Sequence, residues 1–170
     1  MSRHQAAAAW MVAAALGLSA CHGPLGPFAG GRLSGTISTE PSADWSVAAG
    51  HDTVVIETRP DDPYSVQVHY YVVGDQLYVE AMPRGWSRWR GFLAADPLAR
   101  VRFGDRIYPV RAVPVVRADE IASVLPVFYT KDARRPPTGC DVDDARPPCV
   151  AGLRFFRLEP RPHVDPDRAM

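Results

Sequence analysis

Residues 92–112 read FLAADPLARVRFGDRIYPVRA, and this stretch decides the fold. It begins in a short apolar helix that Pro97 ends, because proline cannot continue the helical hydrogen bonding. Two strands are predicted next, over 99–103 and 106–116. Gly104-Asp105 lies between them as a turn pair, which is the local signal of a β-hairpin.

The same organisation continues upstream. Residues 53–58, TVVIET, form a β-branched run typical of a buried strand. Residues 64–73 alternate, and Gly74-Asp75 joins them to a further strand over 76–82. Weaker patterns predict strands over 32–37 and 152–158, a short helical turn over 45–49, and a second helix over 119–129 that Pro126 disturbs. Antiparallel strands with two short helices predict a mainly β, α+β fold built as a small barrel.

Composition narrows the class of protein. The chain has 170 residues with 19 basic and 19 acidic side chains, so its formal net charge is zero and no nucleic-acid partner is expected. Seventeen Pro and 13 Gly predict many short elements and turns. Pro109 and Pro114 lie in the strand predicted over 106–116, and they favour an edge or bulged position for it.

The N-terminus, MSRHQAAAAWMVAAALGLSAC, has the layout of an export signal. Arg3 provides a positive charge, and residues 6–18 are an apolar stretch too short to span a bilayer comfortably. Residues 18–21, LSAC, resemble the lipobox of bacterial lipoproteins. That resemblance implies a signal peptide over 1–20 and a mature protein that begins with Cys21, acylated with diacylglycerol (palmitate). An ordinary cleaved signal or an uncleaved anchor are the alternatives.

The resemblance also implies a location. His22 follows the cysteine where Asp would favour inner-membrane retention, so we expect an envelope protein on the periplasmic face of the outer membrane. No twin-arginine pair precedes the apolar stretch, which favours export as an unfolded chain without a loaded cofactor. The Gly- and Pro-rich residues 21–31 predict a tether, 32–159 a single domain, and 160–170 a frayed tail.

Cys140 and Cys149 remain as an even pair, which in an oxidising compartment predicts a disulfide. Closing this short loop would contribute about 2–3 kcal/mol. A metal site or a redox pair are the rival interpretations, but neither cysteine has a CxxC partner or a nearby His. Asp141, Asp143 and Asp144 lack the glycine and glutamate of a calcium loop and indicate a solvated acidic segment.

Residues 92–112, with the hairpin before them, resemble the FMN-binding split-barrel superfamily, including pyridoxamine-phosphate-oxidase-like and deazaflavin-dependent nitroreductase-like proteins. The resemblance implies a small antiparallel split β-barrel, a homodimer, and FMN or a deazaflavin in a groove on the barrel. By position it implies a strand face, two phosphate-binding arginines and a stacking tryptophan. These residues are Ser65, Gln67 and His69 on the strand, Arg84 and Arg88 for the phosphate, and Trp86 or Trp89 for the ring.

The sequence departs from this family at residues 59–63, RPDDP, where the deazaflavin-dependent members carry a Lys/Arg-Ser-Gly step. Two carboxylates there would repel a phosphate. Helix packing of Trp89 is the alternative to ring stacking. We therefore expect a non-catalytic binding or assembly module first. A flavin- or deazaflavin-dependent oxidoreductase comes second, and a haem-binding protein with His69 as ligand third.

Overall fold

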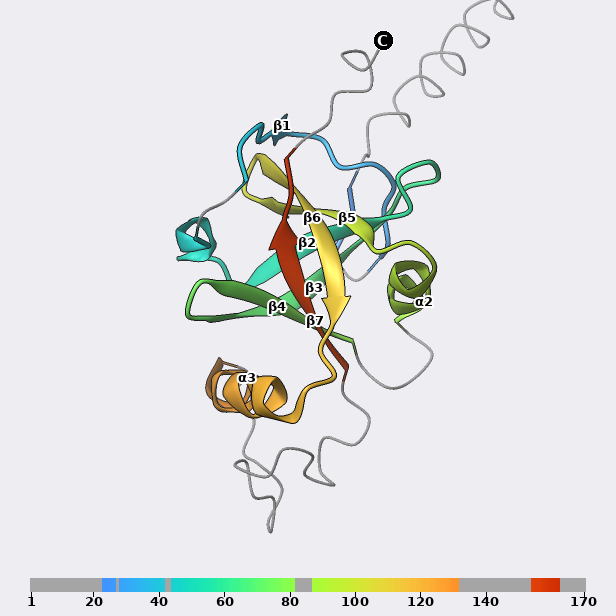
Figure 1. The fold of residues 1–170 in the computed structure, drawn as a ribbon. Helices are drawn as coiled ribbons and strands as arrows, with labels where there is room; N and C mark the ends of the chain where they lie inside the picture. Colours follow the sequence, from blue (N-terminus) through green and yellow to red (C-terminus); the bar gives the residue numbers. More distant parts are fainter. Residues whose placement is uncertain (1–22, 27, 42–43, 82–86, 132–153, 163–170) are drawn as a thin grey trace, which may run out of the picture.

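The computed structural model describes residues 23–26, 28–41, 44–81, 87–131 and 154–162, and Figure 1 shows their arrangement. The elements are β1 (Thr36–Ile37), η2 (Ser46–Ala48), β2 (Thr53–Thr58), β3 (Tyr64–Val73), β4 (Gln76–Ala81), α2 (Arg88–Ala95), β5 (Leu98–Phe103), β6 (Arg106–Pro114), α3 (Ala118–Lys131) and β7 (Arg154–Pro160). None of the helices within these ranges is long and apolar enough to cross a membrane.

The strands form one sheet in the order β1-β6-β5-β2-β3-β4-β7, and a further pairing of β6 with β7 closes six of them into a barrel. These six pair antiparallel throughout. β1 is attached to β6 in parallel over two residues. The prediction of a small, mainly antiparallel α+β barrel is therefore confirmed.

The two hairpins follow from their turn residues. Gly74 has φ 61° and Gly104 has φ 57°, a left-handed conformation that costs glycine nothing. The predicted strands over 53–58 and 64–73 coincide with β2 and β3. The strand predicted over 32–37 is reduced to the two residues of β1.

The edge position predicted for β6 is wrong, because β6 pairs with β5 on one side and with both β1 and β7 on the other. Its partner on that second side changes along its length, from Ile37 opposite Ile107 to Pro160 opposite Val110. Pro109 lies at the change of partner. Its carbonyl accepts a hydrogen bond from the Arg161 N–H at 3.1 Å. Proline has no backbone N–H to donate, but here the missing hydrogen bond falls at the end of the β6–β7 ladder.

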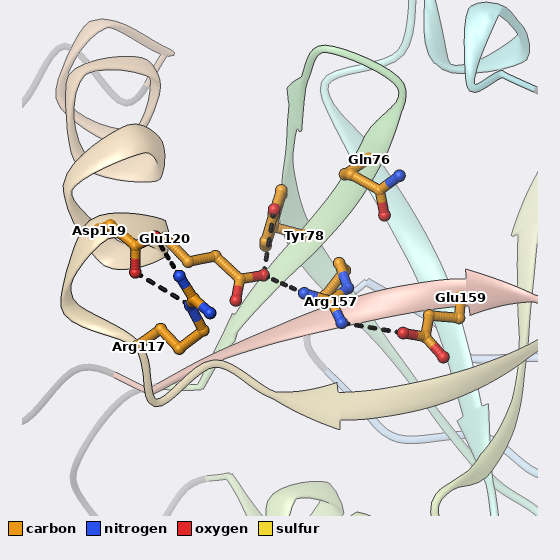
Figure 2. A pocket seen from close by; sticks show the side chains of 7 residues that line it. All are labelled: Gln76, Tyr78, Arg117, Asp119, Glu120, Arg157 and Glu159. Carbon is orange, nitrogen blue, oxygen red and sulfur yellow. Dashed lines mark hydrogen bonds and ion pairs between the residues drawn. The ribbon is translucent and has the colours of Figure 1, made fainter.

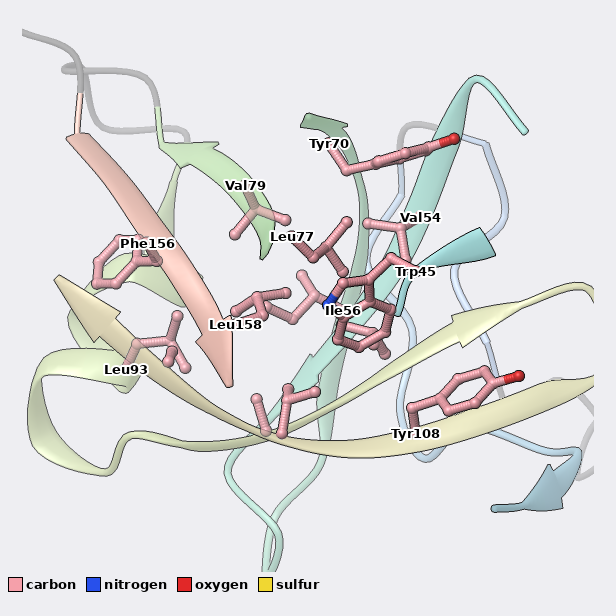
Figure 3. Packing of buried hydrophobic residues seen from close by; sticks show 14 of the residues in the cluster. Trp45, Val54, Ile56, Tyr70, Leu77, Val79, Leu93, Tyr108, Phe156 and Leu158 are labelled. Carbon is pink, nitrogen blue, oxygen red and sulfur yellow. The ribbon is translucent and has the colours of Figure 1, made fainter. Parts of the chain in front are cut away.

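The barrel interior is filled by the inward side chains of all six strands, and Figure 3 shows part of this packing. Helical segments contribute aromatic side chains to this core. Trp45, beside η2, packs 6.0 Å from the Tyr108 ring, and Trp89 of α2 packs 5.8 Å from the Phe156 ring. Both tryptophans are buried. The inward side chains of the described residues therefore form a packed core.

Helix α3 adds a second apolar layer outside the barrel. It covers outward side chains of β3, β4 and β7, and the Tyr71 ring lies 5.5 Å from Phe128 and 6.2 Å from Phe155. Pro126 lies inside α3, yet the helix continues to Lys131. The disturbance predicted for this helix does not end it, because the packed apolar face compensates for one lost hydrogen bond.

Leu125→Ala tests this second layer. Leu125 is fully buried on the barrel-facing side of α3, so the substitution should lower the free energy of unfolding by about 2–5 kcal/mol, measured by urea denaturation. Ser123→Ala, at an exposed position on the same helix, is the control and should change it by less than about 0.5 kcal/mol. Equal effects of the two substitutions would contradict the packing role of α3.

Candidate functional site

The three predicted strand residues lie in one row on the outside of the barrel. Ser65, Gln67 and His69 alternate with the core residues of β3 and therefore face outward. The Gln67 amide donates a hydrogen bond to the Thr53 hydroxyl on β2, and His69 is exposed. Ser65 is fully buried. The row therefore has a closed end at Ser65 and an open end at His69.

The chain itself covers Ser65. We call residues 23–26 and 28–33 the N-terminal segment. Its Gly30 N–H donates to the Ser65 carbonyl at 2.8 Å, and the Ser65 N–H donates to the Gly30 carbonyl at 2.9 Å. The Ser65 hydroxyl is left buried without a hydrogen-bond partner among the described residues. Residues 23–26 and 28–31, which the composition predicts as a tether, thus contact the barrel through backbone hydrogen bonds.

A buried carboxylate fixes the same segment. Glu57 is 2% exposed, and it faces outward on β2 opposite Ser65. One of its oxygens accepts the Leu33 N–H of the N-terminal segment. The other accepts two donors from Arg100 of β5, with Nε at 2.9 Å. This arrangement of one carboxylate, one backbone N–H and one guanidinium, which we call the Glu57 clamp, satisfies a charge that would otherwise be costly to bury.

A second group lies at the end of the barrel beside α2. The Arg59 guanidinium is 4.1 Å from the centre of the Phe92 ring, and the Arg88 guanidinium is 5.8 Å from the Tyr64 ring. Arg59 also pairs with Asp62 at 3.0 Å. Arg59 adopts φ 56°, which is uncommon for a residue with a side chain. We call Arg59, Tyr64, Arg88 and Phe92 the barrel-end cluster.

The other predicted residues are distributed differently. Trp89 is 4% exposed and belongs to the barrel core, whereas Arg88, one residue earlier, is exposed. Cys21, Arg84, Trp86, Cys140 and Cys149 lie outside the described residues. Of the predicted set, the structure therefore places three residues on the outer row, one in the barrel-end cluster and one in the core.

A hollow of about 620 Å³ opens where α3 meets β4 and β7, and Figure 2 shows the side chains that line it. None of them belongs to the predicted set. They are Gln76, Tyr78, Arg117, Asp119, Glu120, Arg157 and Glu159. We call this feature the polar hollow.

Glu120 is the central side chain of the polar hollow. Its carboxylate accepts the Tyr78 hydroxyl at 3.3 Å and pairs with Arg157, which also binds Glu159 at 2.9 Å. Burial and the negative charge of Glu120 raise the pKa of the Tyr78 hydroxyl above its ordinary value of 10.0, so this hydroxyl is a donor at neutral pH. Two arginines face three carboxylates, which suits a partner carrying both charges better than a simple anion.

The described residues contain no group of three or more His, Cys, Asp or Glu side chains arranged to hold a metal ion. The arrangements that the structure does show are therefore a covered strand face, a pair of stacked guanidiniums and an ion-paired hollow. Each of them can bind polar groups.

Two solved structures match with similar geometry: a protein assigned as a pyridoxamine 5′-phosphate oxidase from Listeria innocua and a protein assigned to 5-nitroimidazole antibiotic resistance from Bacteroides thetaiotaomicron. The first has 12% identity over 69% of this chain and 90% of its own, with a TM-score of 0.50. The second has 12% identity over 72% and 83%, with a TM-score of 0.51.

The chain has the split-barrel fold. No protein-family model and no curated protein sequence matches it. The resemblance stated from residues 92–112 is thus confirmed at the level of architecture, where the same closed barrel of antiparallel strands is found. At 12% identity this similarity establishes the fold alone, so any function of the split barrel must be argued from its side chains.

The Glu57 clamp, the polar hollow and the place of Arg59 in the barrel-end cluster were not predicted from the sequence. A signal existed for the first, because Glu57 is the only charged residue in the run TVVIET and it stands in the alternation that faces away from the core. No such signal existed for the polar hollow, whose Tyr78 and Glu120 are 42 residues apart.

Glu57→Leu tests the clamp. The substitution leaves the Arg100 guanidinium and the Leu33 N–H without their acceptor, so the free energy of unfolding should fall by about 3–5 kcal/mol in urea denaturation. Asp119→Asn removes the carboxylate of an exposed ion pair with Arg117 and is the matched control, with no measurable change expected. If both variants unfold at the same urea concentration as the wild type, the clamp does not stabilise the fold.

Proposed function

We propose that this chain is a lipid-anchored protein of the bacterial envelope whose split barrel is a non-catalytic binding or assembly module. The observation that carries the proposal is the covering of Ser65 by Gly30. Split barrels of the resembling superfamily would use this strand face for their cofactor. Here the chain's own backbone is hydrogen-bonded to it on both groups of Ser65.

The other residues that bear on flavin binding, Trp89 and the RPDDP stretch, fit such a cofactor poorly. Trp89 is packed against Phe156 in the core and offers almost no ring surface for stacking. Asp62, one of the two carboxylates of the RPDDP stretch, pairs with Arg59 and so competes with a phosphate for that guanidinium. A flavin would have to displace the N-terminal segment from Ser65 and break an ion pair, which weakens its binding.

The polar hollow supports a role in assembly. It lies at the junction of α3, β4 and β7, and none of its side chains belongs to the residues that the resemblance implies for a cofactor. Its ion pairs are partly exposed, so an incoming polypeptide can exchange them for its own charged groups without burying an unpaired charge. A second copy of the chain is one such partner, in line with the homodimer that the resemblance implies.

The location rests on the N-terminal sequence. The LSAC box, the preceding apolar stretch and Arg3 favour acylation of Cys21, and His22 favours the outer membrane. A polypeptide exported unfolded cannot carry a non-covalent flavin from the cytosol, which also favours a module that needs no cofactor.

Cys21→Ser tests the anchor. When the full chain is produced in a bacterium supplied with radiolabelled palmitate, the wild type should incorporate label and sediment with membranes. The Cys21→Ser variant should do neither, because it lacks the thiol that receives the diacylglycerol. Cys149→Ser should incorporate label like the wild type and serves as the control. Equal labelling of Cys21→Ser and wild type would refute lipid anchoring.

A flavin- or deazaflavin-dependent oxidoreductase is the second candidate, favoured by the two guanidiniums of the barrel-end cluster and by the fold. In that case the cofactor supplies the hydride chemistry and the protein orients it. Arg88 would bind the phosphate through charge-assisted hydrogen bonds.

Titration of the purified protein with FMN separates the two candidates. We expect a colourless protein and no quenching of FMN fluorescence at high micromolar concentration. A yellow protein, with affinity reduced severalfold by Arg88→Ala and unchanged by Arg117→Ala in the polar hollow, would establish flavin binding instead. A Soret band lost on His69→Ala would point to haem.

A further inference from the structure

The N-terminal segment carries two large apolar side chains in water. Leu25 is 64% exposed and Phe28 is 74% exposed. Of the large apolar side chains in the described part of the chain, only Val116 is exposed to a similar degree. Two such residues three positions apart form an apolar feature that no other part of the described structure covers.

The backbone holds these two side chains in a defined loop. The Leu25 N–H donates to the Phe28 carbonyl and the Phe28 N–H donates to the Leu25 carbonyl, both at 3.1 Å. The two ends of the loop also lie against each other. A Cβ on Gly30 would be 2.1 Å from the carbonyl carbon of Gly23, so only glycine fits at position 30. Gly30 is in turn hydrogen-bonded to Ser65 of the barrel. The apolar side chains are therefore presented by a loop fixed to the barrel.

The short connection to Cys21 identifies the surface that this loop meets. Two residue steps separate Cys21 from Gly23, and they span at most about 7 Å. An acyl chain on Cys21 would enter the bilayer within this distance of the barrel surface. Leu25 and Phe28 would then lie at the depth where apolar side chains of interfacial proteins are buried.

A cation lies beside the same point. The Arg102 guanidinium donates to the Ser34 carbonyl at 3.1 Å, and its Nη2 would be 3.6 Å from a Cβ on Gly23. Arg102 has no carboxylate partner among the described residues. The partly exposed Arg102 guanidinium has further N–H donors that could bind the phosphate of a lipid headgroup.

We propose that Leu25 and Phe28 insert into the membrane interface next to the acylated Cys21 and hold the β2–β3–β5 face of the barrel toward the bilayer. This inference rests on the proposed lipid anchoring and adds an orientation to it. Figure 1 shows the N-terminal segment, in blue, at a different place around the barrel from α3. The polar hollow is lined from α3, β4 and β7, so this orientation would leave it outside the strands that face the bilayer.

Quenching by brominated lipids tests the insertion. The full chain is produced in a lipidating bacterium and reconstituted into vesicles of phosphatidylethanolamine and phosphatidylglycerol, with plain or brominated acyl chains. The added tryptophan of Phe28→Trp, after subtraction of the wild-type signal, should lose about half of its emission in brominated vesicles. Val116→Trp is the matched control, at an exposed position just before α3, and its emission should not change.

Adding Leu25→Ser to Phe28→Trp should reduce the quenching, because the loop then inserts less deeply. Mass spectrometry of the same samples reports acylation of Cys21. If Cys21 is acylated and Phe28→Trp is quenched no more than Val116→Trp, the insertion is refuted but the lipid anchor is not. The same result would be obtained if a second copy of the protein covered the loop, and that case also refutes the insertion. If Cys21 carries no lipid, the anchor and the insertion are both refuted.

Discussion

The arrangement of the outer surface of this barrel depends on the interactions of the Glu57 carboxylate with Arg100 and with the Leu33 N–H. A charge with 2% exposure on the outside of a barrel is stable only if it is fully paired. Its two oxygens reach two different elements, Arg100 on the neighbouring strand and Leu33 on a segment from the start of the domain. The ion pair therefore does more than join β2 to β5, because it also brings the N-terminal segment against Ser65.

This covering distinguishes the molecule from what its fold alone suggests. Ser65, Gln67 and His69 form one row on the outside of β3, and only the resemblance implied a cofactor on this row. In this chain the Ser65 end of the row is used for internal hydrogen bonding. The architecture is thus shared with the two solved structures, and the use of the barrel must be argued from its side chains, because one fold serves many functions.

The fold was predictable because its signals are local. The alternation in residues 64–73 and the two Gly-Asp turns each depend on neighbours in the chain, and β2 and β3 were predicted to the residue. The position of β6 was not, because a proline rule for edge strands takes no account of a strand that changes partner at Pro109. The candidate site was predicted less well. Arg100 is 43 residues from Glu57 in the sequence. Whether Ser65 is covered also depends on contacts between residues that are far apart in the sequence, and local patterns do not reveal such contacts.

The closure of the barrel by β7 has a consequence for biogenesis. β7 pairs with β4 on one side and with β6 on the other, and it is the last strand of the described chain. Until β7 is available to pair, both neighbouring strands expose unpaired backbone groups that can template aggregation. On the proposed export route the N-terminus would already be fixed to the lipid while these edges are bare. Holdase chaperones of the periplasm would thus be required for a longer interval than for a protein whose sheet completes early.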